Sequence, residues 1–192
     1  MNDFILGSHN SWSYGCERKK WMRYFRPISC CQNGNILEQY EVGVRCFDLR
    51  LRYDESEKGF VACHGFVTYR NNFMLDLIEL HNKAYSGEDI YVRVLLEDSG
   101  KMDYHVDYMF RMKCKYLEKR FSFIKFIGGW PARKRWRLHL YKFKTEEPEI
   151  DEKHVSVSGR FWQLIPRRWA TKHNDKVIKT GTKSNILMID FV

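Results

Sequence analysis

The chain has 192 residues, 44% of them hydrophobic, and a formal net charge of +9 at pH 7. This length suits a single domain, 1–192, that buries about two-thirds of its unfolded surface, so an enzyme core needs no disulfide or metal for stability. The sequence has no apolar run near the roughly 20 residues of a membrane-spanning helix and no visible signal peptide, which leaves its location open between the cytoplasm and export with a leader removed.

Apolar runs alternate with amphipathic segments in the first half of the chain. The strands predicted there span residues 3–9, 44–53, 60–63 and 90–96. Residues 10–34 are expected to form a long loop. A single helical turn over 36–40 should end at Gly43, since glycine favours helix ends. Residues 73–84 have the apolar spacing of an amphipathic helix.

The second half continues the alternation with weaker signals. In chain order it predicts a helix over 102–120, strands over 121–127 and 136–143, an acidic loop over 145–153, a mixed segment over 155–165 with a further strand, a short helix over 166–170 and a strand over 185–192. The sequence Gly128-Gly129-Trp130-Pro131 indicates a turn between the first two of these strands, because glycine and proline are strong turn formers.

This alternation predicts the fold class. Strands with nearly continuous apolar runs, flanked by helices, are typical of parallel α/β proteins. About eight candidate strands favour a closed barrel over an open sheet. Because the chain is shorter than the roughly 250 residues typical of that fold, we expect a compact, irregular TIM (β/α)8-type barrel with short or missing outer helices.

The predicted loop over 10–34 is both basic and aromatic. Its aromatic residues Trp12, Trp21, Tyr24 and Phe25 alternate with Arg18, Lys19, Lys20, Arg23 and Arg26. Such a segment suits a membrane interface, where aromatic rings lie at headgroup depth and cations meet lipid phosphates. The alternative is a solvated loop whose aromatic residues pack on the rim of the barrel.

The six cysteines show no C-x-x-C spacing. Cys46 and Cys63 fall in predicted buried strands, where free thiols act as small hydrophobic groups. We expect the cysteines to be reduced; the alternative is a disulfide from Cys30 or Cys31 to another partner.

Two histidines and an arginine form a set that can cleave a phosphodiester. His9 follows the first strand and His64 the third, although a single histidine at a strand end is more often structural. Arg50 and Asp48 share one face of a core strand, where a charge needs a partner, a ligand or a metal. One imidazole can act as base and the other as acid, while the guanidinium holds the phosphate. The alternative is an Asp48–Arg50 salt bridge that only shapes the barrel mouth.

Three sequence blocks resemble the X-domain of phosphatidylinositol-specific phospholipases C, within the phospholipase C-like phosphodiesterase superfamily. The blocks are Gly7-Ser8-His9-Asn10-Ser11, Gly43-Val44-Arg45-Cys46-Phe47-Asp48-Leu49-Arg50 and Cys63-His64-Gly65. The resemblance is specific in order and spacing over residues 5–98. The closing residues 186–192 also resemble the last barrel strand of the family, whereas 121–184 match loosely.

The resemblance implies a function and a set of roles. The expected reaction cleaves the bond between a phosphoinositol headgroup and diacylglycerol through a cyclic phosphate. His9 would be the general base, His64 the general acid, and Arg50 would stabilise the transition state. Asp190, on the final strand, would orient His9.

Departures from the family pattern bear on calcium. Metal-free bacterial members have Asp where this chain has Asn10, and calcium-dependent members have carboxylates where Asp48, Arg50 and Glu97 stand. Asn10, Asp48 and Glu97 could therefore supply three oxygen ligands to calcium. Because Arg50 replaces the fourth and can supply the metal's charge, we favour a mechanism without a metal cofactor. Asn10 and Glu97 would then contact the substrate, as could Lys142 on a predicted late strand.

Several functions compete with this hypothesis. A metal-dependent glycerophosphodiester or sphingomyelin-type phosphodiesterase would need a carboxylate pair, and Asp48-Leu49-Arg50 supplies one member. A catalytically silent phosphoinositide-binding module would keep the basic pocket without turnover. Nucleic-acid binding lacks a recognisable module. We expect a monomer that binds an anionic phospholipid or phosphodiester substrate, at a peripheral membrane surface.

Overall fold

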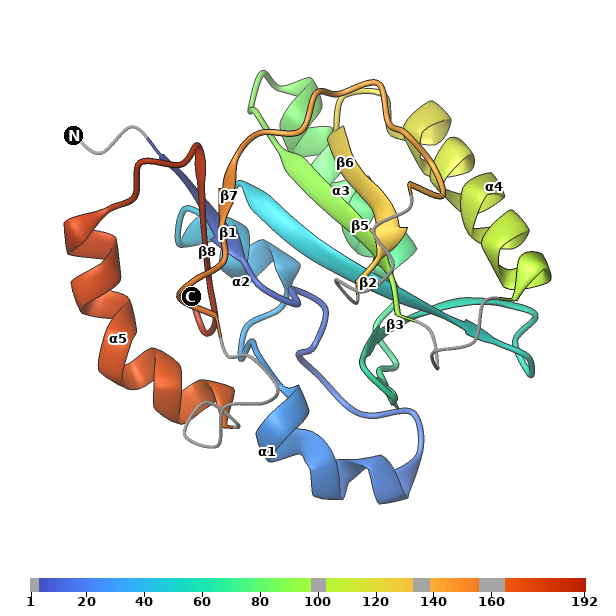
Figure 1. The fold of residues 1–192 in the computed structure, drawn as a ribbon, viewed down its shortest axis with the longest axis horizontal. Coiled ribbons are helices and arrows are strands. Elements are labelled where there is room, and N and C mark those ends of the chain that lie inside the picture. The colour runs from blue at the N-terminus through green and yellow to red at the C-terminus, as the bar shows by residue number, and fades with distance from the viewer. Residues whose placement is uncertain (1–3, 98–102, 133–138, 156–164) are drawn as a thin grey trace.

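The computed structural model describes residues 4–97, 103–132, 139–155 and 165–192. Parallel strands form the centre of this part of the chain (Figure 1). They are β1 (Ile5–Ser8), β2 (Cys46–Asp54), β5 (Tyr91–Leu96), β6 (Lys125–Pro131), β7 (Ile150–Asp151) and β8 (Ile186–Ile189). Their order across the sheet is β7-β8-β1-β2-β5-β6. Their carboxyl ends therefore lie at the same edge of the sheet.

An antiparallel hairpin extends the longest strand. The first half of β2 pairs with β1 and β5, whereas residues 51–54 pair with β3 (Gly59–His64). The short β4 (Val67–Thr68) then pairs with β3. The hairpin thus lies beyond the barrel strands and brings His64 back toward their carboxyl ends.

Helices cover the outer face of the sheet. Residues from α2 (Ile36–Glu41), α3 (Phe73–Tyr85) and α4 (Tyr104–Arg120) share one buried cluster with the outward side chains of β2 and β5. Polar caps begin these helices: Asn35 forms a capping box with Glu38, and Asp103 accepts hydrogen bonds from two backbone amides of α4. The periodic apolar spacing of α3 and α4 accounts for this packing.

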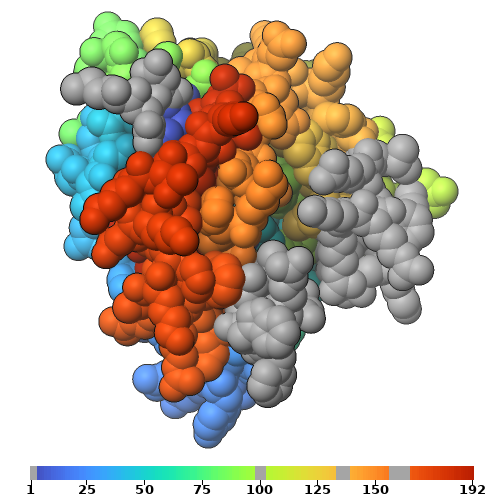
Figure 2. All heavy atoms as spheres, turned by 60° about the vertical axis from the view of Figure 1, so that its left-hand side comes forward, coloured from blue at the N-terminus to red at the C-terminus, as the bar shows by residue number. Residues whose placement is uncertain are grey.

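The helix α5 (Pro166–Thr180) covers β8. Its Val177 packs against Leu187 and Ile189. Figure 2 shows α5 across the side of the molecule, with its lower end above the segment that contains α1 (Arg26–Ser29). Proline in the first turn of α5 and Gly181 after its end are both favourable at those positions.

The sheet curls around an apolar interior. Cys46 of β2, Ile127 of β6 and Met188 of β8 belong to the same buried cluster. Gly7 of β1 faces this interior, where a Cβ atom would come within 2.6 Å of the sulfur of Met188. Within the described residues β6 and β7 do not pair, so the barrel is not closed. The predicted fold class, an irregular α/β barrel, is confirmed.

The prediction of a turn at Gly128-Gly129-Trp130-Pro131 is wrong, because these residues lie within β6. Both glycines have φ near +89°, and the pairing of β6 with β5 shifts register between Val94 and Leu95. A side chain at Gly128 would meet the carbonyl oxygen of Val94 at 2.6 Å. The glycines therefore permit close approach at a bulge rather than a chain reversal.

Other boundaries also differ from the predictions. Residues 121–124 form a turn, and the described part of the predicted 136–143 strand, residues 139–143, has no strand structure. The predicted loop over 10–34 contains a 3-10 helix, η1 (Lys20–Phe25), and α1. The helix predicted over 166–170 extends to Thr180, and the short strands β4 and β7 were not predicted. The strand predicted within 155–165 falls almost entirely outside the described residues.

Two further predictions concern the membrane and the thiols. No helix within the described ranges is both long and apolar enough to cross a lipid bilayer. All six cysteines are free thiols, as expected, and five of them are buried.

Candidate active site

The Gly-Ser-His-Asn-Ser block turns sharply at the carboxyl end of β1. The His9 amide donates to the carbonyl of Ile189, and the Ser11 amide donates to the carbonyl of Asp48. The Ser11 hydroxyl donates to the Ser8 carbonyl at 2.8 Å and accepts from the Asp48 amide at 2.7 Å. These bonds fix the block between β8 and β2, so the position of His9 is set by the backbone on both sides.

The His9 imidazole is bonded at both nitrogens. Its Nδ1 lies 2.7 Å from Oδ1 of Asp190, which follows β8, and its Nε2 lies 2.7 Å from Nη2 of Arg50. A guanidinium can only donate, so Nε2 carries the lone pair and Nδ1 donates its proton to Asp190. His9 is 3% exposed and Asp190 is fully buried. This tautomer leaves a basic nitrogen beside a cation.

Arg50 bonds acidic residues of two segments, as well as His9. Its Nε donates to Oδ2 of Asp48 and its Nη1 to Oε1 of Glu97, both at 3.0 Å. Asp48 and Arg50 alternate with Phe47, Leu49 and Leu51 of the outer core, which places them on the inner face of β2. The Arg50 side chain is 14% exposed, so a solvent-borne ligand can reach it.

Arg93, on β5, is a site residue that the sequence analysis missed. Its Nε donates to Oδ1 of Asp48 at 3.0 Å, and its Nη1 lies 2.5 Å from Oε1 of Glu152. Burial alone would raise the pKa of Asp48, but Arg50 and Arg93 outweigh it and hold that pKa far below its usual value. The signal was present, since Arg93 interrupts an apolar strand just as Arg50 does.

His64 is the last residue of β3, and its ring lies close to that of His9. The centres of the two rings are 6.1 Å apart and their planes are nearly perpendicular. Nδ1 of His64 lies 2.8 Å from the carbonyl oxygen of Ser29, which can only accept, so Nδ1 is protonated. Burial, Arg50 and His9 lower the pKa of His64 to about 4. The free ring is therefore neutral at pH 7, with its lone pair on Nε2.

Asn10 contributes a backbone donor and an amide side chain. Its backbone N–H donates to Oδ2 of Asp48 at 3.0 Å, in a left-handed conformation (φ 52°) that asparagine tolerates. Its Nδ2 atom is buried and has no hydrogen-bond partner among the described residues. A buried orphan donor of this kind is available to a ligand oxygen.

The two carboxylates proposed for calcium are already bound by cations. Both carboxylate oxygens of Asp48 accept from guanidinium groups, and Glu97 accepts from Arg50. Arg50 itself lies among the three proposed ligands. Calcium requires six to eight oxygen ligands with little competing positive charge, so the residues present do not fit a calcium site.

The structure thus brings together seven of the eight predicted site residues: His9, Asn10, Asp48, Arg50, His64, Glu97 and Asp190. Lys142 is the exception. It is exposed on the irregular segment between β6 and β7, not on the late strand predicted for it. Cys31, which follows α1, lies 3.6 Å from Nδ1 of His64 and was not predicted.

Comparisons with known proteins agree with the fold. No family model and no curated protein matches the sequence significantly. The chain is similar to the solved phosphatidylinositol-specific phospholipase C of Listeria monocytogenes (16% identity, TM-score 0.65, covering 97% of this chain and 87% of that one). It is also similar to that of Staphylococcus aureus (12% identity, TM-score 0.61, covering 99% and 86%). At these identities the likeness establishes the fold.

Proposed function

We propose that this protein is a phosphodiesterase that cleaves a phosphoinositide, or a related phosphodiester lipid, by general acid and base catalysis. The observation that carries the proposal is the arrangement around His9: its Nδ1 bonds Asp190, its Nε2 faces Arg50, and His64 lies across a 6.1 Å ring-to-ring gap. The structures similar to this chain, which are phosphatidylinositol-specific phospholipases C, support the same substrate class.

In the first step His9 acts as the base. Its Nε2 takes the proton of the inositol 2-hydroxyl while that oxygen attacks phosphorus, which gives a cyclic phosphate. The Asp190 carboxylate accepts the Nδ1–H bond and stabilises the imidazolium that forms. In the free protein, Nη2 of Arg50 donates a hydrogen bond to Nε2 of His9. It would turn to the phosphate oxygens when the substrate enters.

His64 acts as the acid for the leaving diacylglycerol oxygen. With Nδ1–H held by the Ser29 carbonyl, protonation at Nε2 creates the donor. Because the pKa of His64 is about 4 in the free protein, the ring must gain its proton together with the anionic substrate. A phosphate near the ring favours the charged form and offsets the repulsion from Arg50. Substrate binding would therefore be coupled to proton uptake.

Arg50 supplies the positive charge that a calcium ion would supply in a calcium-dependent phospholipase C. Asp48 and Glu97 orient its guanidinium from two sides, and Arg93 holds the second oxygen of Asp48. A preorganised cation at the phosphate needs no reorganisation during the reaction. We therefore propose a mechanism without calcium.

An exposed aromatic group borders the site and suits a lipid surface. We call it the aromatic rim: Trp21, Phe25 and Phe66. Trp21 stacks on Phe66 with ring centres 6.2 Å apart, and Phe25 contacts Phe66 edge-on at 4.8 Å. Trp21 and Phe66 are about half exposed, and Phe66 is two residues beyond His64. Lys19, Lys20 and Arg23 are exposed beside the rim.

We propose that the aromatic rim docks on a membrane that contains anionic lipid, with its rings at headgroup depth. Trp12, the first aromatic residue of the basic-aromatic segment, takes a different role. Trp12 is buried and donates to Asp76, so it belongs to the core rather than to the membrane surface.

The test is release of water-soluble inositol phosphate from phosphatidylinositol vesicles, in the presence of a calcium chelator and in its absence. We expect equal release under both conditions, loss of release in His9→Ala, and retention in the control His105→Ala, which changes an exposed histidine on α4. Release only without the chelator would contradict the metal-independent mechanism. Vesicle binding without any release would support a silent binding module.

A further inference from the structure

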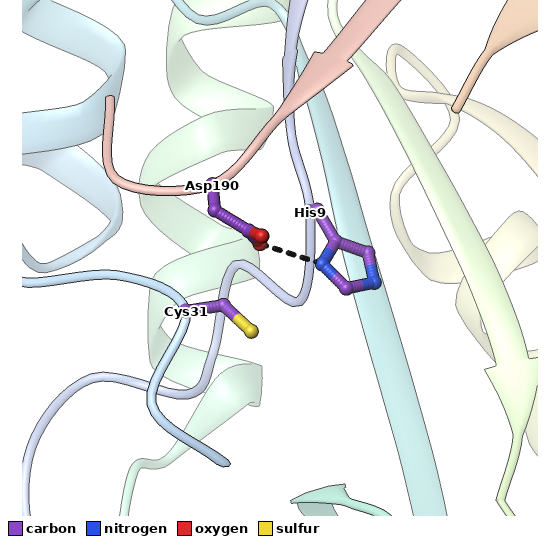
Figure 3. A group of neighbouring side chains, drawn as sticks. All are labelled: His9, Cys31 and Asp190. Carbon is purple, nitrogen blue, oxygen red and sulfur yellow. Dashed lines mark hydrogen bonds and ion pairs between the residues drawn. The ribbon is translucent and has the colours of Figure 1, made fainter. Parts of the chain in front are cut away.

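The thiol of Cys31 lies where the acid and base residues meet, and the proposed reaction does not use it. Cys31 is fully buried, and its sulfur lies 3.6 Å from Nδ1 of His64. The sulfur also lies within 4.8 Å of a carboxylate oxygen of Asp190, the residue that accepts from Nδ1 of His9. Figure 3 shows His9, Cys31 and Asp190 converging from three separate segments of the chain.

We propose that Cys31, His9 and Asp190 form a binding site for a thiophilic divalent cation such as Zn²⁺, which inhibits the protein when it binds. The three ligand atoms, Sγ, Nδ1 and a carboxylate oxygen, lie within 4.8 Å of one another. Tetrahedral zinc binds such ligands at about 2.0–2.3 Å, which places ligand atoms roughly 3.3–3.8 Å apart. Three protein ligands would leave the fourth position to water.

The surroundings of Asp190 show how the ion would fit. One proton, on Nδ1 of His9, points at this carboxylate, and a second, on the thiol of Cys31, belongs to a group beside it. A single cation can replace both protons and bind all three groups. The 2.7 Å separation between Nδ1 and Oδ1 must widen by roughly half an ångström or more to match zinc geometry.

The charge of the surroundings favours a divalent cation despite the nearby guanidinium groups. Four carboxylates belong to the connected network: Asp48, Glu97, Glu152 and Asp190. Within the described residues, Arg50 and Arg93 are the cations of this network. With neutral imidazoles and a neutral thiol, the network carries two excess negative charges, so a divalent ion brings it toward neutrality.

Binding of the ion would disable the base, and this consequence rests on the proposed function. The thiol proton of Cys31 leaves to solvent, and the Nδ1 proton of His9 moves to Nε2. The lone pair that would accept the substrate proton is then gone. The new Nε2–H also faces the donor Nη2 of Arg50, which now lies 2.7 Å away, so that contact must break.

The first experiment measures binding without activity, with Co²⁺ as the spectroscopic substitute for Zn²⁺. All proteins carry Cys16→Ser, which removes the exposed thiol. We expect thiolate-to-cobalt charge-transfer absorption that saturates at one ion per chain. It should be lost in Cys31→Ser and kept in Cys30→Ser, a buried neighbour whose sulfur bonds the carbonyl of Gln32 instead. His9→Ala should weaken Co²⁺ binding at least tenfold.

An absence of the band in the parent protein, or its persistence in Cys31→Ser, would overturn the proposal. Circular dichroism checks that each variant is folded. If Cys31→Ser does not fold, the parent spectrum and the His9→Ala titration decide: an unchanged cobalt affinity in His9→Ala also overturns the site.

The second experiment follows inhibition on phosphatidylinositol vesicles, as the fraction of each variant's own rate that Zn²⁺ removes. We expect more than tenfold loss in the parent, reversal by a chelator, and a requirement for at least tenfold more Zn²⁺ in Cys31→Ser. Equal inhibition of parent and Cys31→Ser would contradict inhibition through this site. If no variant cleaves the lipid, the proposed function fails, while the cobalt spectrum still decides the cation site.

Discussion

The buried cluster around His9 and the aromatic rim lie near each other but are held in opposite ways. The cluster is held by directional hydrogen bonds of 2.7–3.0 Å. They join His9 to Asp190 and to Arg50, and Arg50 to Asp48. In the rim, Trp21 and Phe66 are about half exposed and interact through ring faces and edges. A single substitution in the cluster should therefore abolish most of the activity. A substitution in the rim should weaken membrane binding only in part.

The largest effect is expected from His9→Ala. Removal of the general base should lower kcat on phosphatidylinositol by about 10²–10⁴-fold. The fold should survive, because the neighbouring backbone bonds to Ile189 and Asp48 remain. Turnover assays with circular dichroism measure both outcomes, and a rate within tenfold of the parent would exclude His9 as the base.

Arg50→Lys tests whether direction, rather than charge alone, matters in the cluster. Lysine keeps the charge but cannot bond Asp48, Glu97 and His9 together as the guanidinium does. We expect kcat to fall by about 10²–10³-fold. The matched control is Arg45→Lys, near the start of β2, where Arg45 bonds Glu88 and the Tyr40 carbonyl. A similar loss in both variants would indicate a general effect on β2.

A titration of His64 tests the coupling between substrate and acid. In the free protein its imidazole should titrate at about pH 4, because burial and Arg50 oppose the charged form. A bound inositol phosphate adds negative charge, so the pKa should rise by about one unit or more. NMR titration of the ring, with and without this ligand, gives both values. An unchanged or lower value with the ligand bound would rule out coupled proton uptake.

We expect a moderate loss of membrane binding when two side chains of the aromatic rim are removed. The double variant Trp21→Ala/Phe66→Ala should weaken binding to anionic vesicles about 10- to 100-fold, since each half-exposed ring contributes on the order of 1 kcal/mol of apolar transfer. A water-soluble phosphodiester should still be cleaved at no less than half the parent rate. Tyr108→Ala/Tyr116→Ala removes two exposed rings of α4 and serves as control. Equal binding losses in both double variants would disprove docking through the rim.

The smallest effect is expected from Lys142→Ala. Lys142 is exposed on an irregular segment and belongs to neither region. A flexible, solvated lysine adds little to binding, so KM should change less than about threefold. A larger rise in KM for a soluble substrate would restore the headgroup contact suggested by the sequence.

Local patterns in the sequence predicted most of the cluster. Asp48 and Arg50 were placed on one face by the two-residue alternation of β2, and His9 and His64 by their positions at strand ends. The role of Asp190 followed from the resemblance to phosphatidylinositol-specific phospholipases C. The same reasoning could not supply Arg93's partner, because the contact with Asp48 depends on the register between β2 and β5. Cys31 reaches Asp190 only through tertiary structure.

The errors in the fold have a similar cause. Gly128 and Gly129 are local turn formers, but their close approach to other backbone segments is set by distant residues, Val94 and Tyr141. The helices η1 and α1 are too short to show a helical period. The sequence therefore predicted a loop over residues 20–29. Long, periodic elements such as α3 and α4 were predicted within a few residues.

Because β2 is divided between barrel and hairpin, its two parts should open locally with different free energies. Residues 46–51 pair with β5 within the barrel, whereas 52–54 pair with β3 alone among the described strands. Native-state hydrogen exchange should therefore show a step in amide protection inside one continuous strand, after Leu51. His9 stands on the slowly exchanging side and His64 ends the hairpin, so the two imidazoles belong to units that open with different free energies.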